Sequence, residues 1–114
     1  AVVTARRQIP NLLRDPALLD SALARPRHKY AYDRTTSAFQ LAAAYSYGLA
    51  GNHAFHDGNK RVALVAAAVF LELNGYALDA PEAEAVIVYE QLAAGSVTEE
   101  ALGLWIEQSS VSNV

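Results

Sequence analysis

The chain has 114 residues, no cysteine, a formal net charge of −3 and 53% hydrophobic residues. This length and composition predict one domain, residues 1–114, with a single core. The absence of cysteine excludes disulfides, thiolate nucleophiles and cysteine-based zinc sites, and the negative charge gives no reason to expect nucleic acid as a partner, since duplex binding generally uses a clustered basic surface.

The longest apolar run, residues 62–71, is shorter than the roughly 20 residues that span a bilayer. No basic segment followed by an apolar stretch opens the chain, so we expect no signal peptide, no membrane association and a cytoplasmic protein. The chain starts at Ala1 without a methionine. We interpret residues 1–7 as the remainder of a first helix whose beginning is missing.

Cap residues and prolines divide the chain into helices. Asp15 followed by Pro16 predicts a helix start, and that helix should end before Pro26 because the residue preceding a proline disfavours the helical conformation. Apolar residues at helical spacing predict a second helix over residues 36–49. Within it, Tyr45 and Tyr47 cannot both face the core.

A third helix is predicted to begin at Asn59 and to end at Asn74 and Gly75, which are typical helix-terminating residues. Its core-facing side should carry the apolar residues that recur at helical spacing. These are Val62, Val65, Ala66, Val69, Phe70 and Leu73.

Pro81 predicts the start of a fourth helix, which Gly95 ends, and Thr98 predicts the N-cap of a last helix. The buried residues should be Ala85, Val86, Tyr89 and Leu92 in the former and Leu102, Trp105 and Ile106 in the latter. Residues 77–78 could form a short extended piece, but no sustained alternation of apolar and polar residues predicts a sheet. The fold class is therefore all-α, a compact helical bundle.

The segment from Gly51 to Arg61 is abruptly polar and lies between two apolar helices. Lys60 and Arg61 fall in the first turn of the third helix, where each positive charge opposes the helix macrodipole by about 0.3–1 kcal/mol. Folding alone favours acidic residues there. The pair makes sense if an anion such as a phosphate normally binds at this turn.

The residues before this basic pair complete a possible active site. Gly58 allows the backbone to approach a phosphate closely, and Asp57 offers an oxygen ligand suited to Mg²⁺. His53 has the chemistry of a general base near neutral pH, and Phe55 should anchor the loop in the core.

These residues resemble the signature of the Fic/Doc superfamily, which is a histidine, a phenylalanine, an acidic residue, a glycine or alanine, an asparagine, a lysine or glycine, and an arginine. Here the signature reads His53-x-Phe55-x-Asp57-Gly58-Asn59-Lys60-Arg61. Lysine at position 60 resembles the Doc (death-on-curing) branch. The adenylylating Fic branch has glycine there and a second arginine where this chain has Leu64.

The resemblance extends to residues 14–23, 42–44 and 70–75, and so covers most of the chain. It implies an all-helical fold with the active-site loop between two core helices. It also implies His53 as the general base, Asp57 as the Mg²⁺ ligand, and Asn59, Lys60 and Arg61 as phosphate binders.

For function, the resemblance implies a toxin of a toxin–antitoxin system that acts as a protein kinase. Such an enzyme moves the γ-phosphoryl group of ATP to a threonine or serine of a translation factor, elongation factor Tu, and stops translation. An antitoxin whose disordered tail folds onto the toxin is the implied partner. Two alternatives remain open at this point: adenylyl transfer, and a catalytically idle module that binds a nucleotide or partner.

Other polar and apolar groups have simpler interpretations. His28 and His56 are expected to be ordinary polar residues, and the basic run 25–29 is expected to be solvated surface. The leucines near the first predicted helix could form a groove for an antitoxin helix, but core packing explains most of them better. They are Leu12, Leu13, Leu18, Leu19 and Leu23.

Overall fold

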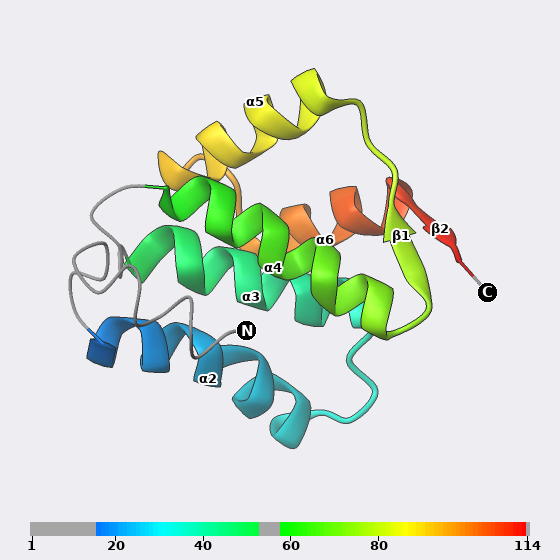
Figure 1. Cartoon of the computed structure of the whole chain (residues 1–114). Coiled ribbons are helices and arrows are strands. Elements are labelled where there is room, and N and C mark those ends of the chain that lie inside the picture. Colours follow the sequence, from blue (N-terminus) through cyan, green and yellow to red (C-terminus); the bar gives the residue numbers. More distant parts are fainter. Residues whose placement is uncertain (1–15, 53–57, 114) are drawn as a thin grey trace, which may run out of the picture.

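The computed structural model describes residues 16–52 and 58–113 of the chain. In chain order and with the labels of Figure 1, the described elements are α2 (Pro16–Tyr32), α3 (Ala38–Asn52), α4 (Asn59–Leu73), β1 (Tyr76–Leu78), α5 (Glu82–Ala93), α6 (Glu99–Gln108) and β2 (Ser110–Ser112). The expected all-α fold is confirmed. Residues 1–7, predicted to be part of a first helix, lie outside the described ranges.

Helix α3 is the centre of the bundle. It packs against α2, α4, α5 and α6, and Figure 1 shows α2 and α5 on opposite sides of it. Its inner surface is built from small buried residues, among them Ala42, Ala43, Ala44 and Ala50. Small side chains let neighbouring helices approach closely, because the distance between helix axes depends on the residues at the contact.

Helix α4 also packs through small residues, and this corrects the face predicted for it. The buried positions are Ala63, Ala67 and Leu71, whereas three residues predicted for the core are exposed: Val65 at 53%, Val69 at 49% and Leu73 at 81%. Alanines at a spacing of four define the buried side, since only small residues allow the close approach to α3. The other predicted residues, Val62, Ala66 and Phe70, pack partly against the core.

Helix α2 runs through Pro26, where the sequence predicted its end. A proline inside a helix removes one backbone hydrogen bond and costs about 3 kcal/mol in isolation. Here Pro26 is buried, so packing offsets that cost. Beyond the proline, an ion pair between Lys29 and Glu99 of α6 also stabilises the helix.

Glu99 binds two cations of α2. Arg25 Nη2 lies 2.7 Å from Glu99 Oε1, and Lys29 Nζ lies 2.5 Å from Glu99 Oε2. Burial favours the protonated carboxyl, but the hydrogen bonds and charges of Lys29 and Arg25 outweigh it and hold the pKa of Glu99 below its usual value. The two ion pairs of Glu99 therefore stabilise the fold at neutral pH, and this contribution is lost as the pH falls through the lowered pKa of Glu99. Two of the basic residues expected to be solvated are thus paired.

The remaining helix ends follow the sequence closely. Gly75 and Gly95 have positive φ after α4 and α5, and the Thr98 side chain accepts a 3.1 Å hydrogen bond from Ala101 N at the start of α6. Ala85, Tyr89 and Leu92 of α5 are buried as predicted, whereas Val86 is 48% exposed. Of the predicted residues in α6, Leu102 and Ile106 are buried and Trp105 is partly buried.

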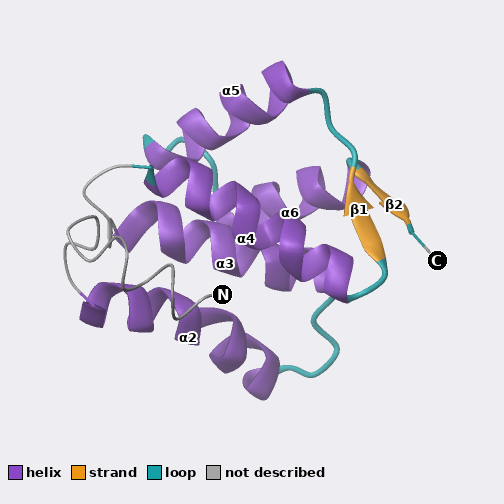
Figure 2. Ribbon diagram, in the orientation of Figure 1, coloured by secondary structure: helices purple, strands orange, loops and turns teal. Residues whose placement is uncertain are grey.

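A small antiparallel sheet lies at one end of the bundle (Figure 2). β1 pairs with β2 in the register Tyr76 to Ser112 and Leu78 to Ser110. The short extended piece at residues 77–78 is confirmed, but its partner strand was not predicted. The strand pair fixes the chain between α4 and α5, because Asp79 N also donates to Ser109 O at 2.7 Å.

Gly48 lies in close contact with the backbone of α2 at Ala22. A Cβ atom added there would lie 3.2 Å from the Ala22 carbonyl oxygen and 3.3 Å from Ala22 Cα, whereas one added at Gly51 would meet nothing within 4 Å. Both glycines lie in the same helix. The absence of a side chain at position 48 is therefore a packing requirement.

We predict opposite effects of alanine at these two glycines. Gly48→Ala should lower the free energy of unfolding by about 1–3 kcal/mol, because backbone atoms of α2 must shift. Gly51→Ala should raise it by about 0.5–1 kcal/mol, because alanine loses less entropy in a helix. Urea unfolding of both variants measures this, and a stabilised Gly48→Ala protein would contradict the close contact.

Candidate functional site

The start of α4 is the centre of the candidate site. Gly58, the residue before the helix, has φ 77° and ψ 12°, the left-handed region that favours glycine. Glycine has no side chain and so supplies no capping oxygen to the first turn. The N-terminal amides of a helix carry a positive partial charge that attracts anions.

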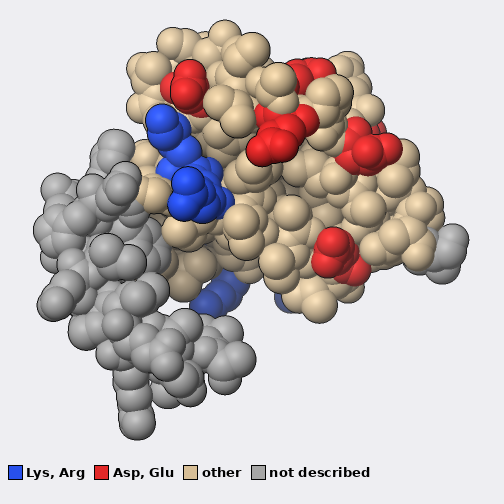
Figure 3. Space-filling model, turned by 45° about the horizontal axis from the view of Figure 1, so that its top comes forward, with Lys and Arg blue, Asp and Glu red and all other residues tan. Residues whose placement is uncertain are grey.

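The charges of this turn differ from those of the next two helices. α4 has no acidic residue in its first turn, where Lys60 and Arg61 are both exposed, whereas α5 begins with Glu82 and Glu84 and α6 with Glu99 and Glu100. In Figure 3, basic side chains gather at one end of the face that is shown, and separate acidic side chains lie across the rest. The first turn of α4 is therefore locally basic on a chain whose formal net charge is −3.

A hollow of about 690 Å³ opens beside this cationic turn, between α4 and α5. Small-molecule sites generally have volumes of about 300–1,000 Å³. Gly58, Lys60 and Arg61 line one end of the hollow. Mostly apolar residues and two glutamates complete the lining: Leu64, Ala68, Leu78, Ala80, Glu82, Ala85, Val86, Tyr89 and Glu90.

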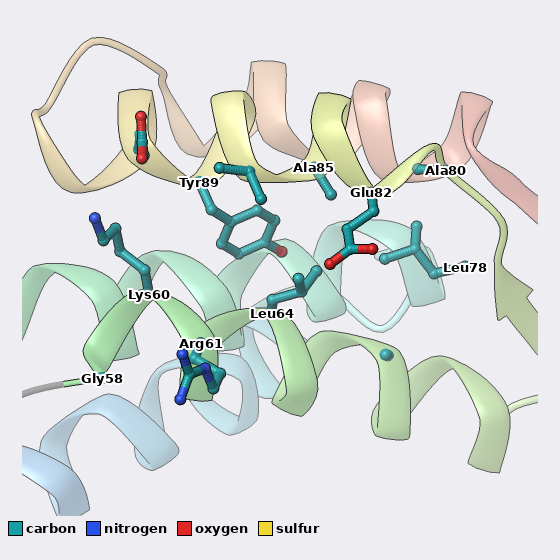
Figure 4. A pocket seen from close by; sticks show the side chains of 12 residues that line it. Gly58, Lys60, Arg61, Leu64, Leu78, Ala80, Glu82, Ala85 and Tyr89 are labelled. Atoms are coloured by element: carbon teal, nitrogen blue, oxygen red, sulfur yellow. The ribbon is translucent and has the colours of Figure 1, made fainter.

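Figure 4 shows how the side chains divide the hollow. Lys60 extends from α4 towards α5, whereas Arg61 points in a different direction. The ring of Tyr89 lies between α5 and α4, and Glu82 reaches into the space from the start of α5. The lining of the hollow thus combines two cations, an apolar wall and two carboxylates, those of Glu82 and Glu90.

Behind the wall, Tyr89 belongs to a buried hydrogen-bond chain. The Ser46 hydroxyl lies 2.7 Å from the Ala63 carbonyl oxygen and 2.7 Å from the Tyr89 hydroxyl. Since a carbonyl can only accept, the single Ser46 proton goes to Ala63 O, and Tyr89 must donate to Ser46. The chain joins α5, α3 and α4 and requires a neutral tyrosine.

Of the remaining predicted site residues, Asn59 is the first residue of α4 and does not line the hollow, and the others lie outside the described ranges. These are His53, Phe55 and Asp57, so their roles stay predictions, as does the role of His56. Within residues 16–52 and 58–113, no group of three or more His, Cys, Asp or Glu side chains is arranged to hold a metal ion. In the same ranges, no helix is long and apolar enough to cross a membrane.

The part of the site that sequence reasoning missed is the wall from β1 and α5. The sequence assigned Tyr89 to the core, and it is indeed 2% exposed, but nothing local indicated that its ring would line a hollow beside Lys60. Tyr45 and Tyr47 behave as predicted: Tyr45 packs on Phe70 with ring centroids 5.2 Å apart, and Tyr47 is 37% exposed. Leu19 and Leu23 pack against the core, as expected for most of the leucines.

The structure thus places a cationic helix start beside a hollow of ligand size in an all-helical fold. The model of the Fic/DOC family matches residues 3–71, more than half of the chain. The chain therefore belongs to the Fic/DOC family. The matched range contains α2, α3, nearly all of α4 and the segment between α3 and α4.

Two relatives named Doc match this chain. It is 48% identical over 69 residues to "Toxin Doc" of Mycolicibacterium smegmatis, which covers 60% of this chain and 53% of the relative. It is 38% identical over 69 residues to "Protein kinase doc" of Escherichia phage P1, which covers 60% of this chain and 55% of the relative. The similar segment spans about half the length of each relative.

Tyr89 gives a testable link between this site and alkaline stability. Burial raises the pKa of Tyr89 from its ordinary value near 10 to about 12, and the hydrogen bond with Ser46 lowers it only in part. The neutral hydroxyl therefore stabilises the fold below about pH 10, and this contribution is lost as the pH rises towards 12.

We predict that the wild-type protein loses more stability than Tyr89→Phe between about pH 8 and about pH 11. Phe keeps the ring and removes only the group that titrates, so titration of lysines and other tyrosines is common to both proteins. Urea midpoints at the two pH values measure the difference. Equal losses in both proteins would contradict the assignment of a neutral, donating Tyr89.

Proposed function

We propose that this protein is a Doc-type toxin that transfers the γ-phosphoryl group of Mg-ATP to a threonine or serine hydroxyl of a translation factor, elongation factor Tu. The observation that carries the proposal is the pair Lys60 and Arg61 in the first turn of α4, at the positions where the family motif binds phosphate. The names of the two relatives, a toxin and a protein kinase, support the same class of activity.

The hollow beside the cationic turn is suited to a nucleoside triphosphate. Lys60 and Arg61 would bind phosphate oxygens, Arg61 through its forked donors and Lys60 as a point charge. The apolar wall of α5 and β1 would accept the less polar part of the nucleotide. Lys60 in place of glycine, and Leu64 in place of a second arginine, favour the Doc-like reaction over adenylyl transfer.

In the proposed reaction, His53 accepts the proton of the target hydroxyl, whose oxygen forms a bond to the γ-phosphorus. The bond from that phosphorus to the bridging oxygen breaks, and its electron pair leaves with ADP. Asp57 would hold the Mg²⁺ ion, which neutralises part of the phosphate charge when bound. Phe55 would fix the loop that carries these residues.

We further propose a cognate antitoxin as partner, because one of the relatives is named "Toxin Doc". A disordered antitoxin tail that folds on binding would order only when toxin is present. Co-purification of the toxin with the protein encoded beside it tests this association.

The first experiment is the intact mass of elongation factor Tu after incubation with this protein and Mg-ATP. We predict the gain of one phosphoryl group, and His53→Ala should slow this gain by about 10²–10⁴-fold while ATP still binds. His28→Ala, at an exposed position in α2, is the matched control and should react like the wild type.

The mass also separates the alternatives. A gain of one adenylyl group would show attack at the α-phosphorus and overturn the kinase assignment. An unmodified elongation factor would contradict this target. A His53→Ala protein that reacts at the wild-type rate would contradict the general-base role.

A second prediction concerns the cationic turn. Lys60→Ala and Arg61→Ala should each raise the dissociation constant for ATP by about 10–100-fold, the loss expected for a charge-assisted hydrogen bond. Arg27→Ala is the control, because Arg27 is an exposed cation of α2 that does not line the hollow. Calorimetric titration with ATP measures the affinity, and equal affinities in all three variants would place the phosphates elsewhere.

A further inference from the structure

Tyr89 takes part in both the hollow and the buried hydrogen-bond chain. Tyr89 lines the hollow, and its hydroxyl donates to the buried Ser46 hydroxyl at 2.7 Å. Ser46, which is fully buried, passes the chain on to the Ala63 carbonyl oxygen of α4 at 2.7 Å. One residue of α5 is therefore connected to the helix that carries the cationic turn.

The hydrogen-bond chain reaches α4 at Ala63, close to the cationic turn. Ala63 is the buried residue of α4 that lies nearest in sequence to Lys60 and Arg61, both of which are exposed. The Ser46 hydrogen bond thus acts on the first buried position behind the cationic turn. Any movement of this position relative to α5 would change the width of the hollow between them.

Tyr89 is itself held from its other side. The Trp105 ring meets the Tyr89 ring edge-on, with centroids 6.3 Å apart. Trp105 Nε1 in turn donates a 2.8 Å hydrogen bond to Glu84 Oε1, near the start of α5. Because α6 and α5 are joined in this way, the tyrosine ring offers a fixed surface rather than one that moves with a single helix.

We propose that Tyr89 and Ser46 are positioning residues that hold the cationic turn of α4 at a fixed distance from the α5 wall, and so set the affinity of the hollow for ATP. This inference rests on the proposed function. Binding groups on rigid elements need such supporting hydrogen bonds to stay in the productive geometry. Tyr89 lies beyond residues 3–71, the range matched to the family, whereas Ser46 lies within it.

The test compares three single substitutions in the full chain. Ser46→Ala removes the hydroxyl at the centre of the chain, and Tyr89→Phe removes only the outer hydroxyl and keeps the ring as a wall. Ser110→Ala is the matched control, because Ser110 Oγ donates to the Ile106 carbonyl oxygen at 2.6 Å, the same kind of bond outside the hollow. Urea unfolding, the KM for ATP and kcat are measured for each.

We expect Ser46→Ala to raise the KM for ATP by about five- to tenfold, and Tyr89→Phe to raise it by a smaller factor. Changes of this size are expected when one hydrogen bond is lost. Ser110→Ala should leave KM unchanged even if it unfolds more easily. A loss of folded protein alone lowers the apparent kcat without changing KM, so the split between the two constants separates positioning from a purely structural role.

Two other results would overturn the proposal in different ways. If wild-type ATP binding depends on Lys60 and Arg61 but all three serine and tyrosine variants share one KM, the positioning role is wrong and the proposed function stands. If the wild type does not bind ATP, the proposed function fails, and the positioning role fails with it.

Discussion

The buried hydrogen-bond chain from Tyr89 through Ser46 to Ala63 is the interaction on which the arrangement of the site depends. It joins α5, α3 and α4 at a point where the surrounding residues are small and apolar, and its donors can be arranged in only one order. Burial makes each of these bonds costly to lose, since an unpaired hydroxyl would remain away from water. The start of α4 and the wall of the hollow are therefore coupled.

The charges at the start of α4 are unfavourable for the helix itself. Lys60 and Arg61 oppose the positive end of the helix, and the following helices show the usual solution, with acidic residues in their first turns. An anion bound at this turn, as proposed above, would offset this unfavourable charge arrangement. The cost to the unliganded protein is met by the rest of α4, whose alanine stripe packs closely on α3 and fixes the helix without help from its first turn.

Tertiary contacts decide the course of α2. Local chemistry ends a helix before Pro26, yet α2 continues to Tyr32 because the proline is buried and Gly48 lets α3 approach the backbone at Ala22. Glu99 then binds Arg25 and Lys29 on either side of the proline in the sequence. Along the chain, Glu99 is 74 residues from Arg25 and 70 residues from Lys29. No local sequence pattern could therefore reveal these ion pairs.

The sequence by itself determined the helix starts at Pro16 and Asn59, the N-cap at Thr98 and membership of the Fic/DOC family, because caps and motifs act within a few residues. Only the tertiary structure decided that α4 buries alanines rather than Val65, Val69 and Leu73, that β1 pairs with β2, and that Tyr89 lines the same hollow as the cationic turn. These three results depend on contacts between elements that are distant in the sequence. In α4, for example, apolar residues recur at helical spacing on more than one side, so the sequence alone does not say which side is buried.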